Sequence, residues 1–253
     1  MRNFWALFKY EAHRLIVSPS TYVIALIFSL SICAIFMLLL SGYSMEEQSV
    51  PFAQMFFRCF FLPTIVIVPL ISMGSFSEEY KNGIFQSLFS VAVSQAEVVL
   101  AKFVSAYLMF MILWLSSLFL FLAVGMESKT ILREAAFAMK FNISGGLLLI
   151  GLVGTFFISI GILSSSLTEN QIISCMVTFF ILMTLFIGGE ALADNSRISN
   201  LNLFGTYSES LKIFSQVDNF CNGIVDSRTV VFYLSSSVLA LCASVIAVQR
   251  KIK

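Results

Sequence analysis

Twenty consecutive residues without a charge, from Thr21 to about Leu40, are the feature that most narrows what this chain can form. Each residue of an α-helix adds about 1.5 Å, so this stretch can cross a hydrocarbon core of about 30 Å. Comparable apolar stretches recur and predict six membrane-spanning helices, at residues 21–40, 55–75, 100–124, 145–163, 172–189 and 230–248. The predicted fold class is an all-α integral membrane protein with one transmembrane domain, residues 1–253.

The composition agrees with a membrane protein and argues against a nucleic-acid partner. Hydrophobic residues make up 58% of the chain, 27 residues are Phe and only 11% are charged, far from the averages of soluble domains. The 15 Lys and Arg residues are scattered and the net charge is +1, whereas binding to nucleic-acid phosphates needs a concentrated basic face. Four cysteines fall in apolar runs and Cys221 in a polar loop, without disulfide or metal-ligand spacing, so we interpret them as packing residues.

Residues 1–20 are predicted to form a helix that lies flat in the membrane interface. Its apolar residues, from Phe4 to Ile16, can share one side of a helix, while Lys9 and Arg14 reach the other side. The first spanning helix would then follow directly after a turn.

Residues 76–99 are predicted to form an interfacial elbow between the second and third spans. Polar residues crowd its start and apolar residues recur at four-residue steps from Tyr80, which is the pattern of an amphipathic helix. Ser94 followed by Glu97 has the spacing of a capping box and predicts a second helix that continues into the third span. The alternative interpretation is an amphipathic loop that rests on lipid headgroups.

The basic residues near the span ends favour both termini on the cytoplasmic side. With the N-terminus inside, eight Lys and Arg residues lie on the cytoplasmic side and six on the outside. The longest loop, residues 191–229, then lies outside, and a short helix within it is predicted to end near Gly223. This helix would either cap the bundle or merely connect the last two spans.

Two sets of residues within the spans are singled out. Small residues on the fourth span would let another helix approach closely, so we interpret them as packing residues rather than as the lining of a pathway; they are Gly151, Gly154, Thr155, Ser159 and Gly161. Arg58 and Glu190 are the charges that come nearest to the hydrocarbon, and we hypothesise that they pair across the outer ends of the second and fifth spans.

Sequence motifs for catalysis are absent. The chain has no G-x-S-x-G, no H-E-x-x-H and no P-loop pattern that could hold ATP phosphates. His13 is the one histidine, so neither a buried Ser–His pair nor a histidine metal cluster can form. We therefore expect no catalytic site and no metal site, and an intramembrane enzyme is the least supported class.

The order of these parts resembles the permease of type-2 ABC exporters, with the closest likeness to the gliding-motility-associated branch. The likeness is carried by residues 8–11 with 18–22, 77–83 with 93–103, and 218–228. The chain departs from the family pattern within the elbow, where Ile84, Ala92 and Ala101 stand in place of a frequent Thr, Pro and Gly.

The resemblance implies a division of labour with a separate ATPase. In such exporters the elbow is a coupling helix that sits in a cleft of the ATP-binding subunit, so a partner-binding role is carried over by position to Glu78, Glu79, Lys81, Asn82, Gly83 and Phe85. The partner would bind ATP and Mg, with no cofactor in this chain. A second permease copy or a paralogue would complete the pathway in the bacterial inner membrane. The alternative is a membrane scaffold or signalling subunit that anchors a cytoplasmic partner and moves no substrate.

Overall fold

The computed structural model describes residues 2–43, 52–81, 94–127, 131–194 and 213–252, and every regular element in these ranges is a helix. Within these ranges, six helical segments are long and apolar enough to cross a membrane, namely Pro19–Leu39, Phe61–Lys81, Gln95–Phe119, Ser144–Leu167, Gln171–Gly188 and Ser227–Lys251. The predicted fold class, an all-α membrane protein with six spans, is confirmed.

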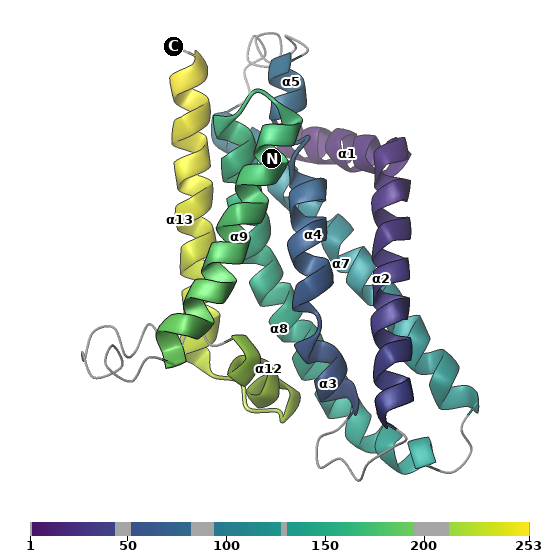
Figure 1. Cartoon of the computed structure of the whole chain (residues 1–253). Coiled ribbons are helices and arrows are strands. Elements are labelled where there is room, and N and C mark those ends of the chain that lie inside the picture. Colours follow the sequence, from purple (N-terminus) through teal and green to yellow (C-terminus); the bar gives the residue numbers. More distant parts are fainter. Residues whose placement is uncertain (1, 44–51, 82–93, 128–130, 195–212, 253) are drawn as a thin grey trace.

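The long helices form a bundle, and short helices cross its two ends (Figure 1). The bundle consists of α2 (Pro19–Tyr43), α4 (Phe61–Ser72), α7 (Gln95–Glu127), α8 (Ile131–Leu167), α9 (Gln171–Asp194) and α13 (Ser227–Ile252). At one end, α1 (Arg2–Val17) runs crosswise to α2, and α5 (Ser77–Lys81) and the last turns of α13 lie at the same end. We call this the elbow end. At the opposite end, the far end, lie α3 (Phe52–Arg58) and α12 (Ile213–Cys221).

Burial separates central helices from peripheral ones. The spans in α4 and α8 are 67% buried within the chain, whereas those in α9 and α13 are 17% buried. The exposed side chains on the peripheral helices are large and apolar, such as Phe180 and Leu239. In the interior, Trp114 packs edge to face against Phe28 and Phe60, with ring centroids 5.3 and 6.2 Å away. The outer faces therefore suit a hydrocarbon environment, and α4 and α8 form the core.

The second apolar stretch is divided by a break that Pro63 explains. A proline inside a helix lacks the N–H for the i−4 carbonyl and its ring crowds that carbonyl, which here belongs to Cys59. The chain accordingly leaves α3 at Arg58, and the Cys59 carbonyl accepts a shorter-range bond from the Leu62 N–H at 3.2 Å. Helix α4 then starts at Phe61, with Pro63 in its first turn.

The predicted capping box at the start of α7 is confirmed. The Glu97 N–H donates to Ser94 Oγ and the Ser94 N–H donates to Glu97 Oε2, both at 3.3 Å. This reciprocal pair satisfies two backbone donors that a helix start would leave unbonded.

The predicted helix end near Gly223 is also confirmed. Gly223 has a φ of 79°, in the left-handed region that favours glycine. Its N–H donates to the Phe220 carbonyl at 3.0 Å, and the Ile224 N–H donates to the Asn219 carbonyl at 2.9 Å. These two bonds form a Schellman motif that ends α12.

The small residues on α8 lie where neighbouring helices come closest. A Cβ on Gly154 would overlap the Phe110 ring of α7, and one on Gly151 would lie 3.2 Å from the Tyr107 hydroxyl oxygen. A Cβ on Gly161 would overlap Ser72 of α4. The glycines therefore permit close approach of α7 and α4 to the central helix.

Two hydroxyl residues of the same stripe are satisfied within α8 itself. Thr155 Oγ1 donates to the Leu152 carbonyl and Ser159 Oγ donates to the Phe156 carbonyl, both at 2.7 Å. Ser159 is fully buried, so these internal bonds keep its polar group paired in the core.

Candidate functional site

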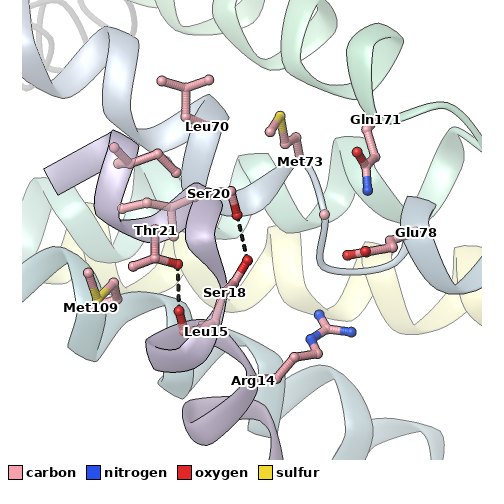
Figure 2. Close-up of a pocket in the computed structure, with 13 residues that line it drawn as sticks. Arg14, Leu15, Ser18, Ser20, Thr21, Leu70, Met73, Glu78, Met109 and Gln171 are labelled. Carbon is pink, nitrogen blue, oxygen red and sulfur yellow. Dashed lines mark hydrogen bonds between the residues drawn. The ribbon is translucent and has the colours of Figure 1, made fainter. Parts of the chain in front are cut away.

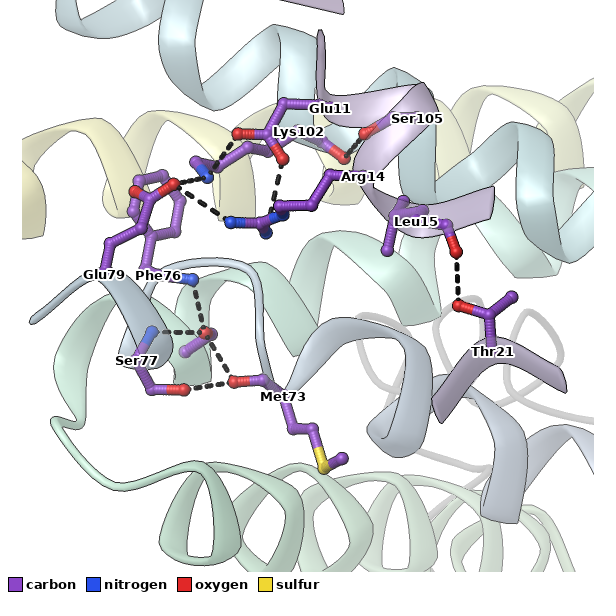
Figure 3. Close-up of polar contacts among 11 residues, drawn as sticks. Glu11, Arg14, Leu15, Thr21, Met73, Phe76, Ser77, Glu79, Lys102 and Ser105 are labelled. Atoms are coloured by element: carbon purple, nitrogen blue, oxygen red, sulfur yellow. Dashed lines mark hydrogen bonds and ion pairs between the residues drawn. The ribbon is translucent and has the colours of Figure 1, made fainter. Parts of the chain in front are cut away.

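Lys102, on α7, is a buried cation at the elbow end. Its side chain is 1% exposed, and its Nζ donates to Glu11 Oε1 at 2.8 Å and to Glu79 Oε1 at 2.5 Å (Figure 3). The Phe76 ring centroid lies 5.1 Å from the same nitrogen. A buried ammonium needs such partners because removing it from water is costly.

Arg14 adds a second cation to the same carboxylates. Its two terminal nitrogens lie 3.2 Å from Glu11 Oε2 and 3.3 Å from Glu79 Oε1. Glu11, Arg14, Glu79 and Lys102 thus form a neutral group of two acids and two bases, which we call the elbow cluster. Glu79 Oε2 is buried without a hydrogen-bond partner, so the cluster is held chiefly through the other carboxylate oxygen.

The elbow cluster joins three helices. Glu11 and Arg14 lie one turn apart on α1, Glu79 is on α5 and Lys102 is on α7. In the sequence, Glu79 lies at the start of the elbow and Lys102 lies just after its end. The cluster therefore fastens both sides of the elbow to α1.

A serine on α8 ties the root of the elbow to the central helix. Ser165 Oγ accepts the Phe76 N–H at 3.0 Å and the Ser77 N–H at 3.3 Å, and it donates to the Met73 carbonyl at 3.1 Å. These bonds satisfy backbone groups in the turn between α4 and α5 that would otherwise be buried unpaired. Figure 3 shows this turn beside the elbow cluster.

The end of α13 also contacts the elbow root. Lys251 Nζ lies 4.0 Å from the Tyr80 ring centroid and 3.6 Å from Glu169 Oε1. Because Glu169 is 78% exposed, the ion pair contributes little, and the cation–π contact is the more specific interaction.

The residues to which the family resemblance assigns partner binding fall into two groups. Glu78 and Lys81 are exposed on α5 and Glu79 is buried in the elbow cluster. Asn82, Gly83 and Phe85 lie outside the described residues. Among the three that are described, Glu79 thus faces the chain itself.

The sequence analysis did not anticipate which residues of α1 contact the rest of the chain. Glu11 is 3% exposed and Arg14 donates to Glu79, while Trp5 is 66% exposed. The search for charges near the hydrocarbon singled out Arg58 and Glu190 and did not identify Lys102, which is buried within the chain. The sequence contains one weak indication of the elbow cluster, an acid and a base that lie one turn apart on α1.

At the far end, Arg58 binds Asp218. Its Nε donates to Asp218 Oδ1 at 2.7 Å and its NH2 lies 2.5 Å from Asp218 Oδ2, while Gln54 Nε2 donates to Oδ1 at 2.7 Å. The structure thus gives Arg58 a different partner from the predicted Glu190, whose side chain lies outside the described residues. The bidentate contact fastens α12 to α3.

Helix α12 covers the far end of the bundle. Val217, Phe220 and Cys221 are buried, and Tyr233 on α13 donates its hydroxyl to Gln216 Oε1 at 2.8 Å. Of the two interpretations of the short helix in residues 191–229, the one in which it covers the bundle therefore holds for α12. Cys221, expected in a polar loop, is instead a buried residue of this helix.

Acidification should weaken the bond between α12 and α3. Burial raises the pKa of Asp218, but hydrogen bonds from Arg58 and Gln54 outweigh it and the pKa is lowered overall. The stabilisation is therefore complete above the unfolded pKa of about 3.9 and is lost as pH falls through the lower folded value. Since both partners are partly exposed, Asp218→Asn should cost about 1 kcal/mol at pH 7.

The measurement is the unfolding free energy in detergent at neutral pH and near pH 3. The difference between the original chain and Asp218→Asn should shrink at the lower pH. An equal difference at both pH values would contradict this assignment.

The fold defines a class, the multi-pass helical membrane protein, and in this chain a buried ion cluster lies at the base of one inter-span segment. A model of the family described as ABC-2 family transporter protein matches residues 13–185, which is more than half of the chain. The chain therefore belongs to the ABC-2 transporter family and is a membrane permease of an ABC transporter, a class that works with an ATP-binding cassette subunit. No curated protein matches the sequence.

The matched region contains most of the elbow cluster. Arg14, Glu79, Lys102 and Ser165 all lie within residues 13–185, whereas α12 and α13 follow it. The resemblance to type-2 ABC permeases is thus confirmed at the level of the family.

Proposed function

We propose that the chain is the permease subunit of an ABC exporter and that its elbow, residues 76–99, couples it to a separate ATPase subunit. The observation that supports this most is the elbow cluster. The cluster connects the start of the elbow, through Glu79, to two other helices. These are α7, which contains Lys102, and α1, which contains Glu11 and Arg14.

Force applied to the elbow would reach the core by two routes. The first runs through the elbow cluster to α1 and α7, and the second through Ser165 to α8. Helix α1 leads into α2 through a turn in which Thr21 Oγ1 donates to the Leu15 carbonyl at 2.5 Å. ATP-driven movement of the partner would therefore shift several helices as one body, as transitions between two discrete states require.

Glu79 and Lys102 act in this proposal as positioning residues. The contacts to the ATPase are assigned to Glu78 and Lys81, which are exposed, together with Asn82, Gly83 and Phe85. The partner supplies the site for ATP and Mg, and this chain supplies none.

The proposal places the elbow end in the cytoplasm of a bacterial cell, with both termini inside and the chain in the inner membrane. The count of basic residues near the span ends supports this orientation. A second copy or a paralogue would provide the other half of the pathway, and membership of the gliding-motility-associated branch stays a prediction.

The test is ATP hydrolysis by purified components in lipid. The chain alone should show no ATPase activity, and the complex with its ATP-binding cassette subunit should hydrolyse ATP faster when substrate is added. Hydrolysis by the chain alone would overturn the division of labour. If none of the candidate substrates tested changes the ATPase rate of the complex, the scaffold alternative would be favoured.

Reversing the charge of Lys81 should weaken binding to the ATPase without unfolding the permease. Lys81 is exposed at the end of α5, so Lys81→Glu leaves the core intact, but it places a wrong charge at the proposed interface. We expect roughly tenfold less ATPase subunit to co-purify with the variant. Lys9→Glu, an equal change at an exposed position on α1, is the control, and equal losses in both variants would count against the elbow as the docking segment.

A further inference from the structure

A pocket of about 290 Å³ opens between the α1–α2 turn, α4, α5 and α9 at the elbow end (Figure 2). Its volume is near the lower end of those that hold small ligands or parts of larger ones. Two of its lining residues, Arg14 and Glu78, also belong to the proposed coupling function, but that function gives the hollow itself no ligand. One part of its lining is polar and charged, and another part is apolar.

The polar part carries opposite charges from different helices. Arg14 from α1, Glu78 from α5 and Gln171 from the start of α9 point towards the same hollow (Figure 2). Gly74 lies beneath two of them, since a Cβ on Gly74 would be 3.4 Å from Glu78 Oε2 and 4.0 Å from Gln171 Nε2. Within the described part of the chain, neither Glu78 nor Gln171 has a hydrogen-bond or ion-pair partner.

The chemistry of this lining favours a zwitterion over a simple anion. Arg14 already faces two carboxylates of the elbow cluster, so the unpaired Glu78 gives the pocket a surplus negative charge. An ammonium group that can donate hydrogen bonds would neutralise it. An anionic group without such an ammonium would be repelled by Glu78.

Donors for a phosphate lie on the other side of the pocket. Arg14 has N–H groups beyond those in its two ion pairs. Ser18 and Ser20 share one hydrogen bond, at 2.7 Å between their oxygens, so one hydroxyl proton stays free to donate. Both serines lie at the amino end of α2, whose partial positive charge also favours an anion.

The apolar part of the lining points to a lipid rather than to a soluble compound. Ile24, Leu70, Ile71 and Met109 belong to the spanning helices α2, α4 and α7. Trp5 and Tyr22, which are more than 60% exposed on α1 and the start of α2, are of the type enriched at headgroup level. The pocket therefore combines polar groups with apolar walls near residues of the type found at the membrane interface.

We propose that this pocket binds the headgroup of an ethanolamine phospholipid, with its ammonium on Glu78 and Gln171 and its phosphate beside Arg14, Ser18 and Ser20. The first part of the acyl chains lies against the apolar wall.

The test uses the purified full chain alone in detergent, with lipid binding followed by native mass spectrometry. Dioleoyl phosphatidylethanolamine should bind roughly tenfold more tightly than dioleoyl phosphatidylglycerol or phosphatidylcholine, because only the ethanolamine headgroup carries a hydrogen-bonding ammonium. Glu78→Gln should remove this preference. Glu169→Gln, which changes a carboxylate that is 78% exposed and outside the pocket, should leave it unchanged.

A second variant tests the pocket without changing its charge. Gly74→Ala adds one methyl group at ordinary contact distance from Glu78 and Gln171, so the fold should persist while the space for the ammonium shrinks. It should also weaken binding of the ethanolamine lipid.

Two results would overturn the proposal. One is equal binding of the three lipids with no effect of Glu78→Gln. The other is displacement of the lipid by free phosphoethanolamine at equal concentration, which would assign the pocket to a soluble compound. Because no ATPase subunit is present, either failure leaves the proposed coupling function unaffected.

Discussion

Replacing Lys102 by Met is expected to destabilise the chain by about 3–5 kcal/mol, the usual cost of leaving a buried charge uncompensated. The variant would retain Glu11 and Glu79 on either side of an apolar side chain, with Arg14 as the one remaining cation of the elbow cluster. The measurement is the unfolding free energy in detergent, with the yield of monodisperse chain as a second readout.

A compensating change should restore much of this loss. Adding Glu79→Gln to Lys102→Met leaves one acid and one base, Glu11 and Arg14, which remain paired at 3.2 Å. We expect the double variant to recover at least about half of the stability lost. Lys251→Met is the matched control, and its weak pair with an exposed acid together with its cation–π contact to Tyr80 predicts a cost of about 1 kcal/mol. Equal costs for Lys102→Met and Lys251→Met would contradict the cluster's role.

Gly161→Ala should destabilise the contact between α8 and α4 by about 1–3 kcal/mol, as overpacking of a filled core usually does. The added Cβ would lie 2.6 Å from Ser72 Cβ, and Ser72 is fully buried with its hydroxyl bonded to the Val68 carbonyl at 2.8 Å. One of the two helix backbones must therefore move. The unfolding free energy in detergent measures this cost.

Gly188→Ala is the control, because the same substitution is expected to leave the unfolding free energy unchanged or to raise it. Apart from the adjacent residues and the backbone of α9 itself, nothing lies within 4 Å of a Cβ at Gly188, so the change adds helix propensity without a clash. It should be neutral or stabilising by up to about 1 kcal/mol. If Gly161→Ala were as harmless as Gly188→Ala, α8 and α4 would not be packed as closely as described.

Features determined by neighbouring residues could be predicted from the sequence. The spans follow from uncharged runs of sufficient length, the start of α7 from Ser94 and Glu97, and the end of α12 from Gly223. Each of these depends on one continuous stretch of sequence. The chemistry that decides them is therefore visible in the sequence.

The elbow cluster could not be predicted because its partners are distant in the sequence. Lys102 lies 91 residues from Glu11 and 23 residues from Glu79. The sequence alone presents Glu79 as one of several polar residues at the start of an amphipathic helix, and Lys102 as a basic residue near a span end. Only the packing of α1 across the elbow end brings them together.

The partner of Arg58 was missed for a related reason. Glu190 is close to the end of its predicted span, whereas Asp218 belongs to α12, which packs against the far end. Arg58 and Glu190 were paired because their positions near span ends predict a similar depth in the membrane. Such positions do not reveal that a helix within a long loop packs back against the bundle.

The most direct test of the account is the side of the membrane on which the elbow lies. A single cysteine at Asn82, in a chain whose own cysteines at 33, 59, 175, 221 and 242 are replaced, would be labelled with a membrane-impermeant maleimide. A cysteine at the exposed Asn222 of the far end is the control for the opposite side. The Asn82→Cys variant should react in inverted inner-membrane vesicles and not in intact spheroplasts, and the Asn222→Cys variant should show the reverse. Labelling of Asn82→Cys from the outside of spheroplasts would contradict coupling to a cytoplasmic ATPase.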